Sequence, residues 1–248
     1  NYQSVLERTK AKKEGERRLA FWRGVLMPMS PNLKLVFVSR HFAEEVFEDL
    51  GFRVSEDSYA VIHNPIDTQL FSYEAKPLEQ RKRVLSIRPY SSRTYANDLT
   101  VKAILKIAEQ PCFGDMEFRL IGDGKLFDET LEPLRGFANV TIERGFLTQT
   151  EIAKLHKEYG VLLIPTRTDS QGVSRDEAMA SGLVPVTTRV AAVPEFVDES
   201  CSILTPAEDA EALAEGIVCL YESPALFDRL SKAAAQRVAK QTASNLII

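Results

Sequence analysis

The stretch VLLIPTRTDSQGVSRDEAMASGLVPVTTRVAAVPEFV, residues 161–197, decides the fold. Its first five residues form an apolar run that Pro165 closes, a pattern typical of a strand buried on both faces of a parallel sheet. A polar loop, residues 166–172, follows, and segment 173–181 then predicts a helix that Gly182 ends. Because residues 185–188 predict the next strand, the whole stretch indicates a strand, loop, helix and strand in succession.

The loop between this strand and this helix is a candidate ligand site. Open α/β sheets bind ligands at the carboxyl ends of their parallel strands. The first N–H groups of a helix have no partner within the helix, so they favour an anion. We therefore expect an anionic ligand near the residues of this loop and of the helix start: Asp169, Ser170, Gln171, Gly172 and Val173.

The same stretch resembles the donor-binding signature of family 4 glycosyltransferases, which are retaining enzymes of the GT-B fold. The resemblance consists of an acid, seven residues and a glutamate, here Asp169 and Glu177, with Gly172 between them and EAMASG, PVTT and VPEFV after them. It implies that Asp169 lies near the sugar of a nucleotide-sugar donor. It also implies that Glu177 accepts hydrogen bonds from the ribose hydroxyls and that the helix N-terminus meets the diphosphate.

Two arginines follow an earlier predicted strand, residues 84–87. Arg88 and Arg93 would lie at the tip of that strand, before a predicted helix at 97–108, and two guanidinium groups suit a diphosphate there. In the resembled family an Arg and a Lys five residues apart bind the donor diphosphate and stabilise the leaving group. The resemblance therefore implies a catalytic role for Arg88 and Arg93, together with Asp169.

Two more loops complete the predicted donor site. Gly122 and Gly124 follow the predicted strand 117–121 and permit a tight turn close to a ligand, where the resembled family also has Gly-x-Gly. Phe146 and Leu147 follow the predicted strand 140–143, where the backbone of the family's loop contacts the nucleobase. All four residues are predicted donor contacts.

The order of the predicted elements sets the fold class. Strands and helices alternate from residue 84 to 204, so we predict an α/β, Rossmann-like parallel sheet with helices on both faces. The resemblance identifies residues 84–248 as the C-terminal donor-binding domain of a GT-B enzyme and 68–83 as a linker. Residues 1–67 would be the tail of an N-terminal, acceptor-side Rossmann-like domain, in which Ser39 caps a helix that Gly51 ends.

Three predicted helices have no role in this site. Residues 127–136 are predicted as one helix, and Thr150 as the cap of an amphipathic helix at 151–159. His156 on that helix is interpreted as structural, because nothing around it forms a catalytic relay. Residues 1–26 predict a helix whose apolar end, with Trp22, docks on a neighbouring element; a peripheral contact with a membrane is the alternative.

Composition excludes several classes of function. The 248-residue chain has a net charge of −4, so no basic field favours nucleic acid. No apolar run reaches the roughly 18 residues needed to span a membrane. Cys112, Cys201 and Cys219 lack paired or zinc-binding spacing, and we expect buried thiols in a reducing cytosol, with the protein cytoplasmic or peripheral at the inner face of the membrane. No metal or other cofactor is expected.

The leading prediction is the donor-binding portion of a retaining hexosyltransferase. It would transfer a sugar from a nucleoside-diphosphate sugar to a glycan, lipid or other acceptor in polysaccharide biosynthesis. The acceptor would bind to the rest of the N-terminal domain, so these 248 residues alone are expected to be inactive.

Three alternatives remain: a sugar-nucleotide epimerase, a glycan phosphorylase, and a non-catalytic module that binds a nucleotide sugar or a partner protein. No lysine for a pyridoxal cofactor lies in residues 161–197, which disfavours the phosphorylase. The presence of Arg88 and Glu177 disfavours the non-catalytic module.

Overall fold

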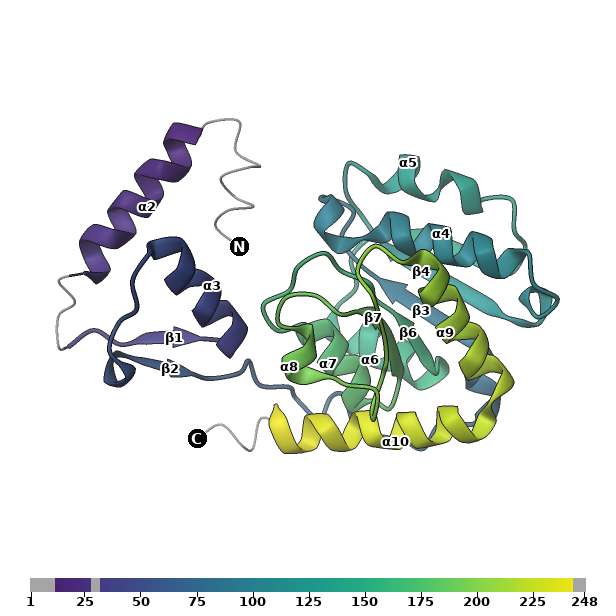
Figure 1. Cartoon of the computed structure of the whole chain (residues 1–248). Coiled ribbons are helices and arrows are strands. Elements are labelled where there is room, and N and C mark those ends of the chain that lie inside the picture. The colour runs from purple at the N-terminus through teal and green to yellow at the C-terminus, as the bar shows by residue number, and fades with distance from the viewer. Residues whose placement is uncertain (1–11, 28–31, 243–248) are drawn as a thin grey trace. The chain divides into compact units, whose positions relative to one another are not determined.

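The computed structural model describes residues 12–27 and 32–242, and the chain divides into two compact units, Asn1–Asn64 and Pro65–Ile248 (Figure 1). The first unit contains a small parallel sheet of two strands with Leu35 opposite Tyr59. Its elements are α2 (Lys12–Leu26), β1 (Leu35–Phe37), α3 (Arg40–Leu50), a 3-10 turn (Glu56–Ser58) and β2 (Tyr59–Val61). The expected helix at residues 1–26 is thus present from Lys12 onward, and residues 1–11 lie outside the described part.

The caps of α3 confirm the predicted helix boundaries in this unit. The Ser39 hydroxyl accepts a hydrogen bond from the Phe42 N–H, and Gly51 ends the helix with φ of 77°. That left-handed conformation carries little penalty for a residue without a Cβ. The buried side chains of Phe37 and Phe47 join α3 to the strands.

The apolar end of α2 is only partly covered within its unit. Arg23 ties the helix to the end of α3, because its Nε donates to the Leu50 carbonyl at 2.7 Å. Leu26 is buried, but Phe21 and Trp22 remain 62% and 39% exposed. Among the described residues, no helix combines the length and apolar character needed to cross a membrane.

The second unit is built on a six-stranded parallel sheet in the order β5-β4-β3-β6-β7-β8. The strands are β3 (Arg83–Ile87), β4 (Glu117–Gly122), β5 (Val140–Arg144), β6 (Val161–Leu163), β7 (Val184–Thr188) and β8 (Ile203–Thr205). Chain order therefore reverses between β3 and β6, as in a doubly wound Rossmann sheet. This confirms the predicted α/β class.

Helices cover both faces of this sheet (Figure 1). They are α4 (Asn97–Ala108), α5 (Phe127–Leu131), α6 (Gln149–Glu158), α7 (Val173–Ala180), α8 (Val193–Phe196), α9 (Ala210–Glu222) and α10 (Pro224–Gln241). Strand residues alternate between the two resulting cores, as the pleat requires. Val84 and Val161 pack with residues of α4 and α9, whereas Leu85 and Leu162 pack with residues of α6 and α7.

Three local predictions are corrected by the structure. Thr148, not Thr150, caps α6, because its hydroxyl accepts the Glu151 N–H while the Glu151 carboxylate accepts the Thr148 N–H. The predicted helix 127–136 is α5 followed by a 3-10 turn, Glu132–Leu134, since Pro133 has no N–H to continue the α-helical pattern. Cys219 is exposed, and only Cys201 of the three free cysteines is buried.

Residues 68–83, interpreted from the sequence as a linker, belong to the second unit. The Phe71 side chain is buried in its core. Lys76 is buried too, and its ammonium donates to the His156 carbonyl. His156 is itself buried, which lowers the pKa of its imidazole to about 3 and keeps the ring neutral.

Candidate functional site: the carboxyl edge of the second sheet

The predicted site residues come together at one edge of the six-stranded sheet. Arg88 and Arg93 follow β3, Gly122 ends β4, Phe146 follows β5, and the loop with Asp169 follows β6. Because all six strands are parallel, their carboxyl ends share this edge. The β3 and β6 loops flank the point where strand order reverses, which is where open α/β sheets form their ligand crevice.

Arg88 is a buried cation that forms no ion pair within the described part of the chain. The residue is only 6% exposed, and its Nε makes no hydrogen bond although it is shielded from solvent. The guanidinium lies 4.9 Å from the centre of the Tyr95 ring, and no carboxylate of the described residues forms an ion pair with it. Burial lowers the pKa of Arg88, an effect that the nearby Asp169 carboxylate partly offsets. Arg88 therefore presents positive charge at the sheet edge that the nearby Asp169 carboxylate offsets only in part.

Gly122 and Gly124 let the β3 and β4 loops pack closely. A Cβ at Gly122 would lie 1.9 Å from the Arg88 carbonyl oxygen, and one at Gly124 would lie 2.3 Å from the Tyr90 carbonyl carbon. The Tyr90 N–H donates to the Asp123 carbonyl at 2.8 Å across the same junction. Both glycines thus have a packing role in holding the backbone beside Arg88, and their contact with a donor stays a prediction.

The β6 loop delivers the N-terminus of α7 to the same edge. Gly172 precedes the helix with φ of 92°, and no side chain caps the helix start. Asp169 shapes the turn, because its Oδ1 accepts the Gln171 N–H at 3.1 Å. Ser170 is exposed and Val173 is half-buried. The Arg175 N–H donates to the Gly172 carbonyl, whereas the N–H groups of Val173 and Ser174 have no hydrogen-bond partner within the described residues and remain available at the edge.

A buried ion pair on α7 holds this loop in place. Arg175 and Asp176 are each 2% exposed, and Arg175 Nη2 lies 2.7 Å from Asp176 Oδ1. Arg175 Nη2 also donates to the Gln171 carbonyl at 2.6 Å, and its guanidinium lies 5.3 Å from the centre of the Phe196 ring. Burial raises the pKa of Asp176 despite the Arg175 charge. The pair holds Gln171 in place, because Arg175 bonds to both the Gln171 carbonyl and Asp176.

Glu177, the second acid of the predicted signature, is a nearly buried carboxyl with one weak donor. It is 8% exposed, and Gln149 Nε2 donates to its Oε1 at 3.4 Å. Burial, reinforced by the Asp176 charge, raises the pKa of Glu177 to about 7. A perturbed carboxyl at a ligand-binding edge is a common property of functional sites.

The β5 loop provides an exposed aromatic ring. Phe146 is 79% exposed, the largest exposed fraction among the large hydrophobic side chains of the described residues. The next residue, Leu147, packs against the core on the α6 and α7 face of the sheet. The loop is therefore anchored at Leu147 while Phe146 stays free for contact.

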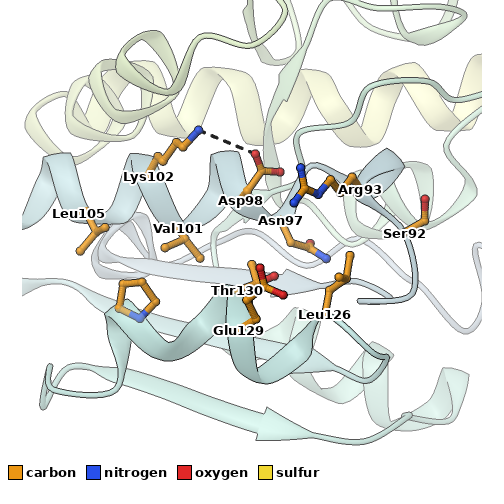
Figure 2. A pocket seen from close by; sticks show the side chains of 11 residues that line it. Ser92, Arg93, Asn97, Asp98, Val101, Lys102, Leu105, Leu126, Glu129 and Thr130 are labelled. Atoms are coloured by element: carbon orange, nitrogen blue, oxygen red, sulfur yellow. Dashed lines mark ion pairs between the residues drawn. The ribbon is translucent and has the colours of Figure 1, made fainter.

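Arg93 is exposed, and its side chain makes no ion pair with any described residue. It lies at the mouth of a hollow of about 390 Å³ between α4 and α5 (Figure 2). The Arg93 carbonyl accepts a hydrogen bond from Arg167, whose guanidinium also pairs with Asp98 and Glu208. The β3 and β6 loops are thus joined through Arg167.

The sequence analysis missed Gln149, Arg167 and the Arg175–Asp176 pair. Adjacent opposite charges inside the otherwise small and apolar segment 173–184 were a usable signal for the buried pair. Gln149 and Arg167 gave no such signal, because their partners are distant in the sequence. Gln149 lies 28 residues from Glu177, and Arg167 lies 69 residues from Asp98 and 41 from Glu208. Within residues 12–27 and 32–242, no group of three or more His, Cys, Asp or Glu residues could hold a metal ion.

Comparison with known sequences gives the family of the chain. The family model of glycosyl transferases group 1 matches residues 81–223, more than half of the chain. An MMP alpha-(1->4)-mannosyltransferase from Mycolicibacterium hassiacum is 26% identical over 201 residues, which are 79% of this chain and 47% of that protein. The chain therefore spans about half the length of this curated relative.

Solved structures share the fold at low sequence identity. Sucrose-phosphate synthase from Thermosynechococcus elongatus matches with a TM-score of 0.76 and 19% identity, over 98% of this chain and 62% of that one. Anabaena Alr3699/HepE, solved in complex with UDP and glucose, matches with a TM-score of 0.70 and 16% identity, over 86% and 60%. The six-stranded sheet and its helices thus have the fold of a GT-B glycosyltransferase domain, and the chain belongs to the group 1 glycosyl transferases.

Proposed function

We propose that the second unit binds the nucleoside-diphosphate sugar of a retaining, family 4 hexosyltransferase. The observation that carries this proposal is Arg88, a 6% exposed guanidinium that forms no ion pair with any carboxylate of the described residues. A buried charge without a partner is costly, so its presence at a ligand-binding edge indicates that an anion completes the site. The diphosphate of a nucleotide sugar has the charge and the oxygen geometry for this position.

The surrounding groups fit the remaining parts of such a donor. The free N–H groups at Gly172 and Val173 suit the diphosphate, because a helix N-terminus favours negative charge. Glu177 would accept hydrogen bonds from the ribose hydroxyls, and Asp169 would contact the sugar. Phe146 and Leu147 would contact the base, the former with an exposed ring. The neighbouring structure that contains UDP and glucose supports a ligand of this class.

The proposed chemistry relies on electrostatic stabilisation of the leaving group. An acceptor hydroxyl oxygen bonds to the anomeric carbon of the sugar as the bond to the diphosphate breaks, and the hydroxyl proton passes to the departing diphosphate. Negative charge grows on the departing diphosphate, and Arg88 and Arg93 would stabilise it. Retention of anomeric configuration and independence from metal belong to the proposal.

The acceptor side is proposed to involve the first unit and residues that longer relatives have. The chain covers 47% of the mycobacterial mannosyltransferase, so an acceptor wall of the relatives' size is not contained in these residues. We expect the 248 residues to bind a donor but to transfer sugar slowly, because the orientation of an acceptor hydroxyl accounts for several kcal/mol of barrier lowering. A glycan or lipid acceptor, a cytoplasmic location and a membrane contact of α2 are parts of the same proposal.

Calorimetric titration tests the proposal. The chain is titrated with UDP, GDP and ADP, with the matching nucleosides, and with the sugar derivative of whichever diphosphate binds best. We expect at least one diphosphate to bind and its nucleoside to bind far more weakly, because the diphosphate meets Arg88. A chain that binds no nucleoside diphosphate, or that binds the nucleoside equally well, would refute the proposal.

A further inference from the structure

Arg167 has every donor of its guanidinium engaged. Its Nε donates to Glu208 Oε1 at 2.6 Å, and its Nη2 donates to Glu208 Oε2 at 2.8 Å and to Asp98 Oδ2 at 2.9 Å. Its Nη1 donates to Asp98 Oδ1 at 2.8 Å and to the Arg93 carbonyl at 2.6 Å. An arginine side chain has five N–H groups, so Arg167 has none left for a ligand. Its function must be exerted through the groups that it holds.

The most consequential of these groups is Asp98, an acid that lines the same hollow as Arg93. Asp98 Oδ1 and the Arg93 carbonyl bond to the same nitrogen of Arg167, and Asp98 and Arg93 line the same hollow. Arg93 begins the 3-10 turn Arg93–Tyr95 and Asp98 lies in the first turn of α4, and Figure 2 shows both side chains among those that line the hollow. Even so, Arg93 forms no ion pair with Asp98, whose two carboxylate oxygens both accept hydrogen bonds from Arg167.

No other charged side chain among the described residues binds both carboxylate oxygens of Asp98 as Arg167 does. Lys102 lies 3.9 Å from Asp98 Oδ2, at the limit of an ion pair, and is 61% exposed. Glu208 is bound to Arg167 alone. Glu129 lines the far wall of the hollow on α5 and makes no ion pair with Arg93. Only Arg167 binds both oxygens of Asp98.

We infer that Arg167 is a positioning residue that keeps Arg93 free for the diphosphate, by binding the carboxylate that would otherwise neutralise it. The inference rests on the proposed function, since it names how one of the two proposed diphosphate ligands stays available. Arg167 also fixes the Arg93 backbone, because the Arg93 carbonyl and the Thr94 carbonyl both accept hydrogen bonds from it. Two effects, one electrostatic and one geometric, thus act on the same side chain.

A double-variant cycle separates this role from simple structural support. Binding of the best nucleoside diphosphate is measured calorimetrically for the unaltered chain, Arg167→Met, Asp98→Asn and the double variant. We expect Arg167→Met to lower affinity about fivefold, the effect of one exposed ion pair with Arg93. Adding Asp98→Asn should restore affinity to within about twofold, because the competing carboxylate is gone.

A merely structural role predicts the opposite, since removing Asp98 as well would loosen the loop further. A double variant that binds as weakly as Arg167→Met, or more weakly, would therefore overturn the inference. Glu208→Gln is the matched control: it removes the other carboxylate from Arg167 but frees no acid beside Arg93, so affinity should stay within about twofold. If Arg167→Met does not fold, Arg167→Lys carries the test, because an ammonium cannot bind both oxygens of Asp98 at once.

Failure of this inference is distinguishable from failure of the proposed function. If Arg93→Ala lowers diphosphate affinity while Arg167→Met does not, only the role of Arg167 is wrong. If neither Arg88→Met nor Arg93→Ala changes the binding of any nucleoside diphosphate, the proposed donor site is wrong and the inference falls with it.

Discussion

Two buried arginines at the same sheet edge have opposite surroundings. Arg175 is 2% exposed and is matched by Asp176, the Gln171 carbonyl and the Phe196 ring. Arg88 is 6% exposed, lies over the Tyr95 ring and has no anionic partner among the described residues. The difference indicates different tasks. A matched charge holds a loop in one conformation, whereas an unmatched one leaves a position for a ligand of opposite charge.

The largest effect is expected from breaking the matched pair. Arg175→Met leaves the Asp176 carboxyl buried without its partner, which should lower the free energy of unfolding by about 3–5 kcal/mol. Urea unfolding followed by circular dichroism measures this loss. The double variant Arg175→Met with Asp176→Leu should recover most of it, because no uncompensated charge remains. A single variant as stable as the unaltered chain would contradict the assignment of Arg175 as matched.

The same substitution at the unmatched arginine should act on binding instead. Arg88→Met removes a buried cation that has no ion-pair partner among the described residues, so stability should be unchanged or slightly raised. Affinity for the nucleoside diphosphate should fall roughly tenfold to a hundredfold, the loss of a charge-assisted contact worth about 1.5–3 kcal/mol. Titration calorimetry and urea unfolding of one preparation give both quantities. If Arg88→Met destabilises the chain as much as Arg175→Met does, the distinction between the two arginines fails.

Glu177 is a buried acid that resembles Arg88 rather than Arg175, because among the described residues its carboxylate accepts only the weak hydrogen bond from Gln149. Glu177→Ala should weaken nucleoside diphosphate binding by roughly tenfold or more, because a carboxylate that accepts two ribose hydroxyls contributes about 1.5–3 kcal/mol. The matching 2′,3′-dideoxynucleotide serves as the control ligand, and its affinity should hardly change. Equal losses for both ligands would mean that Glu177 does not contact the ribose.

The raised pKa of Glu177 also makes stability depend on pH. With a pKa of about 7 in the folded protein and an ordinary value of 4.5, the folded chain holds a proton that the unfolded chain has released. Stability should therefore fall as pH rises from 4.5 to about 7 and level off above it. The contribution is about 1–2 kcal/mol after allowance for partial solvent contact. Urea unfolding between pH 5 and 8 should show that Glu177→Gln lacks this dependence; an identical slope would locate the proton elsewhere.

The sheet could be predicted from sequence because its cause is local. Apolar runs such as residues 161–164, followed by Pro165 or by glycine turns, specify buried strands without knowledge of their neighbours. The order of the strands then brings Arg88 and Asp169 to one edge. Helix boundaries were less predictable: Thr148 and Thr150 are both good caps, and only the reciprocal bond with Glu151 selects Thr148.

The charge state of the site could not be predicted from the sequence. Whether an arginine is matched depends on partners that folding brings together, such as Asp98 and Glu208 around Arg167, 69 and 41 residues away. The sequence analysis likewise predicted a tight turn and donor contacts for Gly122 and Gly124, but not their packing against a second loop. Their observed packing against the Arg88 and Tyr90 backbone depends on the approach of two loops, which spacing within either loop does not reveal.

The smallest expected effect concerns Gln149. It tests whether the pKa of Glu177 is set by this hydrogen bond as well as by burial. The Gln149 amide donates to Glu177 at 3.4 Å and so favours the charged carboxylate, against the burial that raises its pKa. In Gln149→Ala this support is lost, and a smaller fraction of Glu177 is ionised at pH 7. Affinity for the nucleoside diphosphate should then fall by about two- to threefold at pH 7, in line with one weak hydrogen bond.

At pH 8.5 the carboxyl is ionised in both proteins, so the variant and the unaltered chain should bind equally well. Calorimetric titrations at pH 6.5, 7.5 and 8.5 provide the comparison, and Gln149→Glu supplies its matched control. A glutamate at this position adds a negative charge beside Glu177, which should raise the pKa of Glu177 further and weaken binding more than Gln149→Ala does. If Gln149→Ala lowers the affinity for the nucleoside diphosphate by the same factor at every pH, the Gln149 amide contacts the nucleotide itself. The hydrogen bond from Gln149 then does not set the ionisation of Glu177.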